Sequence, residues 1–327
     1  MSLVHPTNLK PNFGSPSALR THTGAASIKV RNAAGASHHH GLEPKDSSPS
    51  LPRVAPTSGT PEEASTTAAC GARELPPLGS LRIAILLNSY NSPYIAALKS
   101  SYEKCLLAIS PSSSLSFYYP AHDMHALPNP ALFDLIVVGG SNVDPQKAHP
   151  WVLKVHQYIR DIARDWPQKK MVGICWGHQT MALVFGGKVR DMDVPELGIT
   201  TNALTPRGNT FFRFTASNNG KMRVQQHHRR EVSHPAPGFI PLLDGRQAFI
   251  NANNTILTFQ GHPEKDAETA LLRLNDATRW YGMDVTNPEV RDRLRRRMEG
   301  DHDGDFVWRR ILEWVGEEGV GVADGVA

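Results

Sequence analysis

The sequence has few cysteines, no long apolar run and no large excess of charge of either sign. Its 327 residues include three cysteines, at positions 70, 105 and 175. Cys70 falls in a polar tail and Cys105 in a predicted helix, so we expect no disulfide framework and a reducing compartment. No apolar stretch approaches the length of a membrane span. The 35 basic residues nearly balance the 31 acidic ones, which gives no general reason to expect binding of nucleic acid or of an anionic membrane.

Residues 1–79 differ in composition from the rest of the chain. They are rich in Ser, Thr, Pro, Gly and Ala and lack periodic apolar spacing, which predicts a disordered N-terminal tail. The tail carries basic residues but no acidic residue before Glu43, a bias typical of mitochondrial transit peptides. Pro11 and Pro16 argue against an amphipathic helix there. We therefore expect a cytoplasmic protein, with mitochondrial targeting as the alternative.

From residue 80 onward, apolar runs alternate with segments of helical spacing. Strands are predicted at 81–87, 115–119, 135–138, 171–174 and 255–259, and helices at 94–109, 152–162, 267–281 and 306–315. This alternation argues for an α/β fold with a doubly wound, mostly parallel sheet. A β-rich insertion is expected at about 187–259, and the basic segment 291–297 is expected to be a solvated helix face. We place the domain at residues 80–316, followed by a frayed end at 317–327.

Cys175 lies where a predicted strand meets a predicted helix. In such a strand–turn–helix elbow, the side chain at the turn stands exposed above the sheet. Gly173 and Gly177 flank it, as a tight turn requires where a Cβ would clash. The dipole of the following helix favours thiolate over thiol, and thiolate is the form that attacks carbonyl carbons. Cys175 is therefore a candidate nucleophile, with an inert core cysteine as the alternative.

His262 lies just past the predicted strand 255–259, and Glu264 follows two residues later. Residues i and i+2 of an extended segment lie on the same side, so the carboxylate can reach one imidazole nitrogen while the other faces the thiol. Pro263 makes the turn stiff. The spacing predicts a triad of Cys175, His262 and Glu264, in which a nucleophile, a base and an orienting carboxylate act together. Taken alone, His262 would be an ordinary turn histidine.

A pair of glycines ends the predicted strand 135–138. The backbone amides of Gly139 and Gly140 can approach a carbonyl oxygen closely because no side chain intervenes. With the backbone N–H of Trp176 they are candidate donors of an oxyanion hole. The alternative is that the two glycines only form a tight turn.

In this order, the motifs at 139–140, 173–179 and 261–264 resemble those of the class-I (triad) glutamine amidotransferase family, over about residues 80–300. The sequence is similar to stand-alone amidotransferase-like proteins of fungi and, more distantly, to plant γ-glutamyl peptidases. The resemblance implies a flavodoxin-like α/β domain that hydrolyses the γ-amide of glutamine or of a γ-glutamyl compound. The intermediate would be a γ-glutamyl thioester on Cys175, and the partner a small-molecule substrate.

The resemblance also implies substrate contacts. In the family, the counterpart of the segment 225–232 presents backbone groups, often near a histidine, to the α-amino and α-carboxyl ends of glutamine. The matching positions are His228, Arg229 and Arg230, and Gln179 is a further substrate contact. Family members often have Gly or a small or aromatic residue there, so the two arginines depart from the pattern. They are either solvated charges at a strand edge or a fork for a carboxylate on a substrate larger than glutamine.

No phosphate-binding loop, Rossmann glycine fingerprint or second catalytic domain is visible, and the histidines at 38–40 have no second ligand cluster. We therefore expect neither a cofactor nor a metal site. Without a synthetase domain, either a separate ammonia-accepting enzyme receives the ammonia, or the protein cleaves a γ-glutamyl bond and releases the products. A non-catalytic regulatory subunit that keeps the fold is the alternative from another class, although no triad residue is lost. A thiol-dependent chaperone or protease on a related scaffold usually lacks the His-Pro-Glu arrangement.

Overall fold

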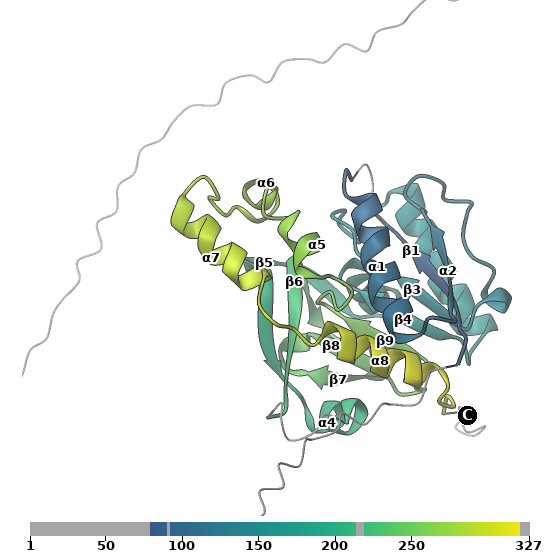
Figure 1. Cartoon of the computed structure of the whole chain (residues 1–327). Helices are drawn as coiled ribbons and strands as arrows, with labels where there is room; N and C mark the ends of the chain where they lie inside the picture. The colour runs from purple at the N-terminus through teal and green to yellow at the C-terminus, as the bar shows by residue number, and fades with distance from the viewer. Residues whose placement is uncertain (1–78, 90–91, 214–218, 321–327) are drawn as a thin grey trace, which may run out of the picture. The chain divides into compact units, whose positions relative to one another are not determined.

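The computed structural model of this chain describes residues 79–89, 92–213 and 219–320. Within these ranges the chain forms a seven-stranded sheet with helices on both faces, together with a separate two-stranded ribbon (Figure 1). The predicted disordered tail lies outside the described residues except for its last residue, Gly79.

The large sheet has the strand order β2-β1-β3-β4-β9-β8-β7. Its strands are β1 (Arg82–Leu86), β2 (Ser114–Tyr118), β3 (Leu135–Val138), β4 (Lys170–Ile174), β7 (Phe239–Leu243), β8 (Ala248–Asn251) and β9 (Ile256–Phe259). The strands from β2 to β9 in this order run parallel, and β8 and β7 extend one edge antiparallel. The predicted α/β fold with a doubly wound, mostly parallel sheet is confirmed.

Most helices begin and end close to their predicted limits. They are α1 (Ile95–Ile109), α2 (Pro150–Asp165), α3 (Trp176–Val184), α4 (Pro206–Phe212), α5 (Ala267–Leu271), α6 (Ala277–Tyr281), α7 (Pro288–Met298) and α8 (Gly304–Val315). The predicted helix 267–281 is instead two short helices, because tight turns such as Arg273 N–H to the Ala270 carbonyl at 3.0 Å separate α5 from α6. Within the described ranges, no helix is both long and apolar enough to cross a bilayer.

Alternate residues of the central strands enter two separate apolar clusters. Ile83 and Ile85 of β1 pack with α1 and α8, whereas Ala84 and Leu86 pack with α2 and α3. Since both faces of the sheet are covered, central strands such as β1 and β3 are continuous apolar runs in the sequence rather than alternating ones. The carboxyl ends of β3, β4 and β9 meet at one edge, which is where doubly wound folds bind their ligands.

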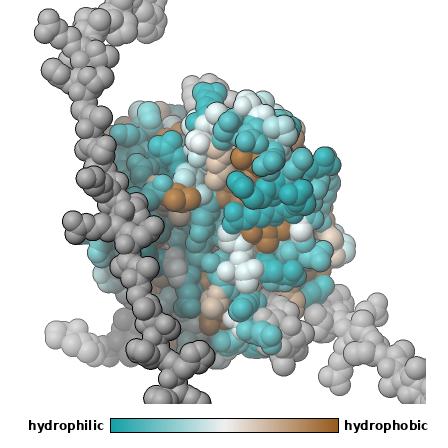
Figure 2. Space-filling model, turned by 90° about the vertical axis from the view of Figure 1, so that its left-hand side faces the viewer, coloured by the Kyte–Doolittle hydropathy of each residue, from teal (hydrophilic) through white to brown (hydrophobic). Residues whose placement is uncertain are grey.

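The β-rich insertion consists mainly of β5 (Lys188–Ala203) and β6 (Lys221–His234), which pair antiparallel as the separate ribbon. Leu294 and Met298 of α7 are buried in a cluster that includes residues of this ribbon, while the arginines between 291 and 297 are exposed. The side of the molecule that carries α7 is mainly hydrophilic, with apolar residues in small separate patches (Figure 2). The basic helix face is therefore solvated, as predicted.

The C-terminal boundary of the domain lies beyond the predicted residue 316. Arg310 of α8 is buried, and its guanidinium donates to the Phe211 carbonyl and to the Glu317 carboxylate, both at 2.6 Å. Val320 N–H donates to the Asn253 carbonyl at 2.9 Å. Residues 317–320 are thus fixed to the domain rather than frayed, and 321–327 lie outside the described residues.

Replacing Trp308 by Ala is expected to lower the free energy of unfolding by about 3–5 kcal/mol. The ring is fully buried and meets Tyr102 edge-on, with 6.1 Å between the ring centroids. Denaturant unfolding measures the loss. Leu153→Ala on α2, where the side chain is 50% exposed, is the control and should stay within about 0.5 kcal/mol of the unmodified protein. Equal losses in the two variants would contradict the packing of α8 described above.

Candidate active site

Cys175 lies at the turn between β4 and α3, as the strand–turn–helix pattern predicts. Its backbone has φ 52° and ψ −99°, a conformation that costs free energy in any residue with a side chain. The flanking glycines make this turn possible. A Cβ on Gly177 would lie 1.9 Å from the Val138 carbonyl oxygen, and a Cβ on Gly173 would lie 2.7 Å from the Gly177 oxygen. The close approach of β3, β4 and α3 therefore requires both glycines.

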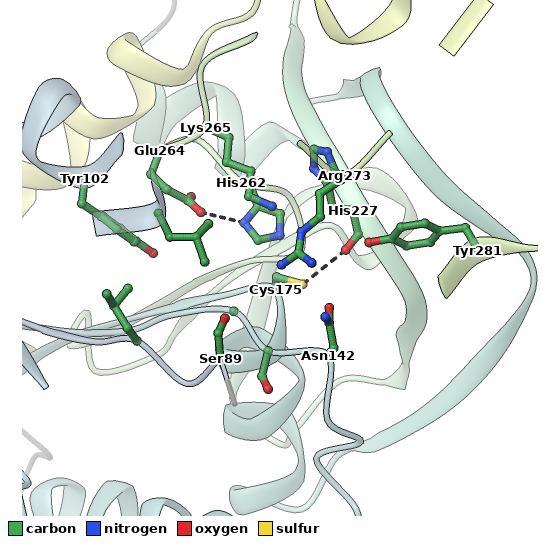
Figure 3. Close-up of a pocket in the computed structure, with 14 residues that line it drawn as sticks. Ser89, Tyr102, Asn142, Cys175, His227, His262, Glu264, Lys265, Arg273 and Tyr281 are labelled. Atoms are coloured by element: carbon green, nitrogen blue, oxygen red, sulfur yellow. Dashed lines mark hydrogen bonds and ion pairs between the residues drawn. The ribbon is translucent and has the colours of Figure 1, made fainter. Parts of the chain in front are cut away.

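His262 follows the end of β9 and is hydrogen-bonded to Glu264. Nδ1 of His262 lies 2.7 Å from Oε1 of Glu264, and both side chains are buried. The backbone N–H of His262 donates to the Gln225 carbonyl at 2.8 Å, which fixes the turn against β6. The ring lies between the carboxylate and the sulfur of Cys175 (Figure 3). A Cβ built on Gly140 would be 3.0 Å from Cε1 of His262 and 3.7 Å from Cβ of Cys175, so the two side chains approach a common point.

Burial keeps the thiol and the imidazole uncharged. It raises the pKa of the Cys175 thiol to about 11, although the charge of Lys265 and the N–H of Trp176 act in the opposite direction. It also holds the pKa of His262 well below its usual range, and Lys265 and Arg273 add to this effect. The expectation that the helix dipole makes Cys175 a thiolate is therefore not met, because desolvation outweighs it. The sulfur can attack only as its proton moves to an acceptor.

Glu264 and Lys265 are both buried next to the imidazole. Burial raises the pKa of the Glu264 carboxyl and lowers the pKa of the Lys265 ammonium, while each of the two charges favours the charged form of the other. The Glu264 oxygen that does not face His262 has no hydrogen-bond partner among the described residues. The protonation of the orienting carboxylate is thus coupled to that of a neighbouring amine.

The structure changes the set of predicted oxyanion donors. The N–H of Gly139 donates to the Leu86 carbonyl at 3.0 Å, and a Cβ on Gly139 would lie 2.8 Å from that oxygen. Gly139 therefore belongs to the backbone pairing of β3 with β1 and, contrary to expectation, is not a free donor. Gly140 lines the cavity beside Cys175. Trp176 N–H, in the first turn of α3, has no acceptor within the helix and lies next to the sulfur. Gly140 and Trp176 remain the candidate donors.

Cys175 lines a cavity that extends in two directions. One wall is named the acyl wall after the part of the substrate that its residues are predicted to contact, and it carries Gln179, His228, Arg229 and Arg230. Gln179 donates through Nε2 to the Arg230 carbonyl at 2.8 Å. Both ring nitrogens of His228 are engaged, with Glu196 Oε2 at 2.9 Å and the Arg230 carbonyl at 3.0 Å. The His228 ring is therefore held in place as part of the acyl wall.

The two arginines of the acyl wall are already paired with acidic side chains. Nε of Arg230, which is largely buried, lies 3.2 Å from Asp191 Oδ1 and 3.7 Å from Asp144 Oδ1. Nε of Arg229, which is exposed, lies 3.9 Å from the same Asp191 oxygen. The predicted fork for an additional carboxylate is therefore neutralised by aspartates. The alternative of a charged strand edge describes Arg229 better.

Sequence reasoning singled out His228 and missed its neighbour His227. The alternation of β6 turns the two rings to opposite sides, so that His228 faces Glu196 while His227 faces His262, with 5.6 Å between the two ring centroids. The His227 carbonyl accepts a long hydrogen bond from Cys175 Sγ at 3.9 Å. Neither ring nitrogen of His227 has a partner among the described residues. The alternation of side chains along β6 indicates that the two histidines face opposite sides. It does not indicate which of them faces Cys175.

The second wall of the cavity, the basic wall, carries Lys265, Arg273 and Tyr281, which sequence reasoning had not singled out (Figure 3). Lys265 directly follows the His-Pro-Glu motif, and this position in the sequence could have indicated that it lies in the site. Arg273 and Tyr281 come from the segment 267–281. Its predicted helical periodicity gave no indication that polar positions would face a cavity.

In the part of the chain that the structure describes, no group of three or more His, Cys, Asp or Glu side chains is placed to hold a metal ion. The histidines at 38–40 lie outside that part.

Comparison with known proteins identifies relatives of this arrangement. The profile of the family described as glutamine amidotransferase class-I matches residues 110–274. The glutamine amidotransferase-like protein chyE of Penicillium rubens is 32% identical over 243 residues, which cover 73% of this chain and 99% of the relative. Gamma-glutamyl peptidase 2 of Arabidopsis thaliana is 29% identical over 150 residues, covering 42% of this chain and 56% of the plant protein. Both resemblances predicted from the sequence are thus confirmed.

The fold has relatives among solved structures. A glutamine amidotransferase from Thermotoga maritima superimposes with a TM-score of 0.53 and 20% identity, covering 73% of this chain and 100% of that one. At this level of identity the likeness concerns the fold alone.

Alkylation of Cys175 by iodoacetamide is expected to be slow at neutral pH and to accelerate through the alkaline range, because only the thiolate reacts and burial raises the pKa of this thiol to about 11. Arg273→Met should shift the acceleration to higher pH, since the Arg273 charge lowers the pKa of the thiol. Peptide mass spectrometry follows Cys175 separately from the other cysteines. The control is Arg293→Met, an exposed position on α7. Fast labelling that is independent of pH between 6 and about 9 would contradict a buried thiol.

Proposed function

We propose that this chain, which belongs to the class-I glutamine amidotransferase family, is a cysteine hydrolase. It cleaves a γ-glutamyl amide bond through a thioester on Cys175. One observation carries the proposal. Cys175, at the elbow after β4, shares a cavity with the hydrogen-bonded pair of His262 and Glu264 after β9. A nucleophile, a base and a group that orients the base are the set that acyl transfer through a thioester requires.

In the first half of the reaction, Sγ of Cys175 attacks the γ-carbonyl carbon of the substrate. A carbon–sulfur bond forms while the thiol proton passes to Nε2 of His262, and the carbonyl electrons move to an oxygen beside the amides of Gly140 and Trp176. The carbon–nitrogen bond then breaks as His262 gives that proton to the leaving nitrogen. Because both groups begin uncharged, the proton moves together with the attack rather than before it.

In the second half, water attacks the thioester. His262 accepts a proton from the water as the carbon–oxygen bond forms, and it returns this proton to the sulfur as the carbon–sulfur bond breaks. The γ-carboxyl product leaves, and the thiol of Cys175 is restored. An imidazolium forms in each half of the reaction, and the Glu264 carboxylate 2.7 Å from Nδ1 stabilises it both times.

Two kinds of γ-glutamyl donor are compatible with this chemistry. With free glutamine, the leaving group is ammonia, which a separate biosynthetic enzyme would use. With a γ-glutamyl peptide of the glutathione type, an amine or peptide is released instead, and the similarity to a plant protein named gamma-glutamyl peptidase supports this second donor. A non-catalytic regulatory subunit is the alternative from another class. The retained arrangement of Cys175, His262 and Glu264 favours an enzyme.

We propose a cytoplasmic location, supported by the small number of cysteines and by an unpaired thiol at Cys105 and at Cys175. The mitochondrial alternative rests on the basic tail, which lies outside the described residues. Imaging of a fusion tagged at the C-terminus separates the two, since import into mitochondria would reject the cytoplasmic location.

Cys175→Ala is expected to abolish hydrolysis of γ-glutamyl amides, because no thioester can form without the sulfur. The measurement combines ammonia release from glutamine with amine release from γ-glutamyl peptides, and mass spectrometry of the unmodified protein for the acyl adduct on Cys175. The control is Cys105→Ala, which removes the thiol on α1. Equal turnover by the Cys175 variant and the unmodified protein would reject the enzymatic proposal.

Glu264→Gln should lower kcat by a factor of about 10²–10⁴ with a smaller effect on KM, since an amide can support the wrong tautomer of His262 and cannot stabilise the imidazolium. Steady-state kinetics on the better γ-glutamyl donor measure the effect. Glu268→Gln removes an exposed carboxylate that pairs with Lys104 and is the matched control. A kcat within about twofold of the unmodified value would remove Glu264 from the mechanism.

A further inference from the structure

Two buried cations line the basic wall, and the charge of the neighbouring Glu264 acts on Lys265 without forming an ion pair with it. Lys265 is 2% exposed and Arg273 is 7% exposed. Among the described residues, neither is in an ion pair, although each other largely buried basic side chain discussed above has a partner: Arg230 pairs with two aspartates and Arg310 with Glu317. The guanidinium of Arg273 lies over the ring of Tyr94, 5.5 Å from its centroid.

Burying a charge without a partner costs several kcal/mol, so side chains in this situation usually neutralise or acquire a partner. Both side chains line the cavity that contains Cys175 and His262, and Figure 3 shows them reaching toward these two residues from the same side. Their charges reach the sulfur, because each lowers the pKa of the Cys175 thiol. The cavity therefore presents two donors with positive charge to whatever occupies it.

The position of these cations relative to the reacting bond follows from the two walls of the cavity. The acyl wall, with Gln179 and the backbone of 228–230, lies on one side of Cys175. Lys265 and Arg273 are absent from the residues that line that side, and they lie with His262 on the other. His262 is the group that delivers a proton to the leaving nitrogen under the proposed mechanism. The basic wall therefore borders the leaving group rather than the acyl group.

The basic wall also continues outward from the cavity. Arg273 lines a second groove together with Lys147, Arg279 and Trp280, and with the acidic residues Asp144 and Asp276. A leaving group larger than ammonia would extend along this groove, beside side chains of both charges. Ammonia would not extend into the groove. It carries no negative charge, so it could not form an ion pair with either buried cation.

We propose that Lys265 and Arg273 form a subsite for a carboxylate on the leaving amine, so that the preferred substrates are γ-glutamyl amino acids or peptides rather than glutamine. This inference rests on the proposed function. It adds that the extra negative charge of the substrate lies on the leaving-group side of the amide bond that is cleaved. A carboxylate would give each cation an ion-pair partner, and a guanidinium is suited to bind it through two parallel hydrogen bonds. It would also favour the charged form of Lys265, whose pKa burial lowers to about 7.

The test compares two donors that differ only in the charge of the leaving group: γ-glutamylglycine and its neutral counterpart γ-glutamylglycinamide. The unmodified protein is expected to show a kcat/KM about 10–100-fold higher for the carboxylate. In Lys265→Met and in Arg273→Met this ratio should fall toward unity, mainly through a higher KM for γ-glutamylglycine. Arg273→Lys, which keeps the charge but not the planar fork, should recover part of the ratio.

The controls separate binding from folding. Lys154→Met and Arg293→Met each remove an exposed positive charge and should leave the ratio unchanged. Thermal unfolding of both methionine variants is measured alongside, so that a lost ratio in a variant that still folds reports on binding. If a methionine variant does not fold, Lys265→Gln and Arg273→Lys give the same comparison of donors.

The outcomes distinguish this inference from the proposed function. A ratio near unity in the unmodified protein, with both donors hydrolysed through Cys175, overturns the subsite and leaves the hydrolase standing. Equal losses on both donors in the two variants also overturn it, because the cations would then act on the acyl group or on the sulfur. Absence of hydrolysis of either donor by the unmodified protein rejects the proposed function, and the subsite falls with it.

Discussion

Two hydrogen bonds hold the left-handed backbone of Cys175, and the geometry of the site depends on them. The N–H of Cys175 donates to the Phe259 carbonyl at 2.7 Å, and the N–H of Gln179 donates to the Cys175 carbonyl at 3.1 Å. The first joins the ends of β4 and β9, and the second begins α3. Since His262 follows Phe259 by three residues, the pairing that fixes the sulfur also fixes the imidazole. The backbone strain at Cys175, about 1–3 kcal/mol, persists because these neighbours over-determine it.

The sequence predicted the fold, and it predicted that the sulfur, the imidazole and the carboxylate would lie together. Both predictions rest on local patterns that are visible in the sequence itself. The run at 135–138 is continuously apolar because both faces of β3 are covered. It therefore indicates a buried strand even when the neighbouring strands are unknown. Gly173 and Gly177 mark the elbow because their missing side chains are a steric requirement of the turn itself. His262 and Glu264 need only a spacing of two residues.

The remaining features depend on pairings that no local pattern contains. The backbone pairing between β3 and β1 ends at a particular residue, and this end determines whether Gly139 or Gly140 has a free N–H. Which of His227 and His228 faces the nucleophile is decided by the register of β6 against β5. The protonation of Cys175 was predicted in the wrong direction because the helix dipole is visible in a sequence, whereas the depth of burial is not.

The ion pair of Arg310 with Glu317 bears on how the protein can be divided into fragments. The stretch that matches the family profile ends at residue 274, yet the Arg310 guanidinium, which joins α8 to α4, pairs with the carboxylate of Glu317. A recombinant fragment cut directly after α8 would retain every strand and still leave an uncompensated charge in its interior. A fragment that keeps this ion pair therefore has to extend beyond the stretch that matches the family profile, at least to Glu317.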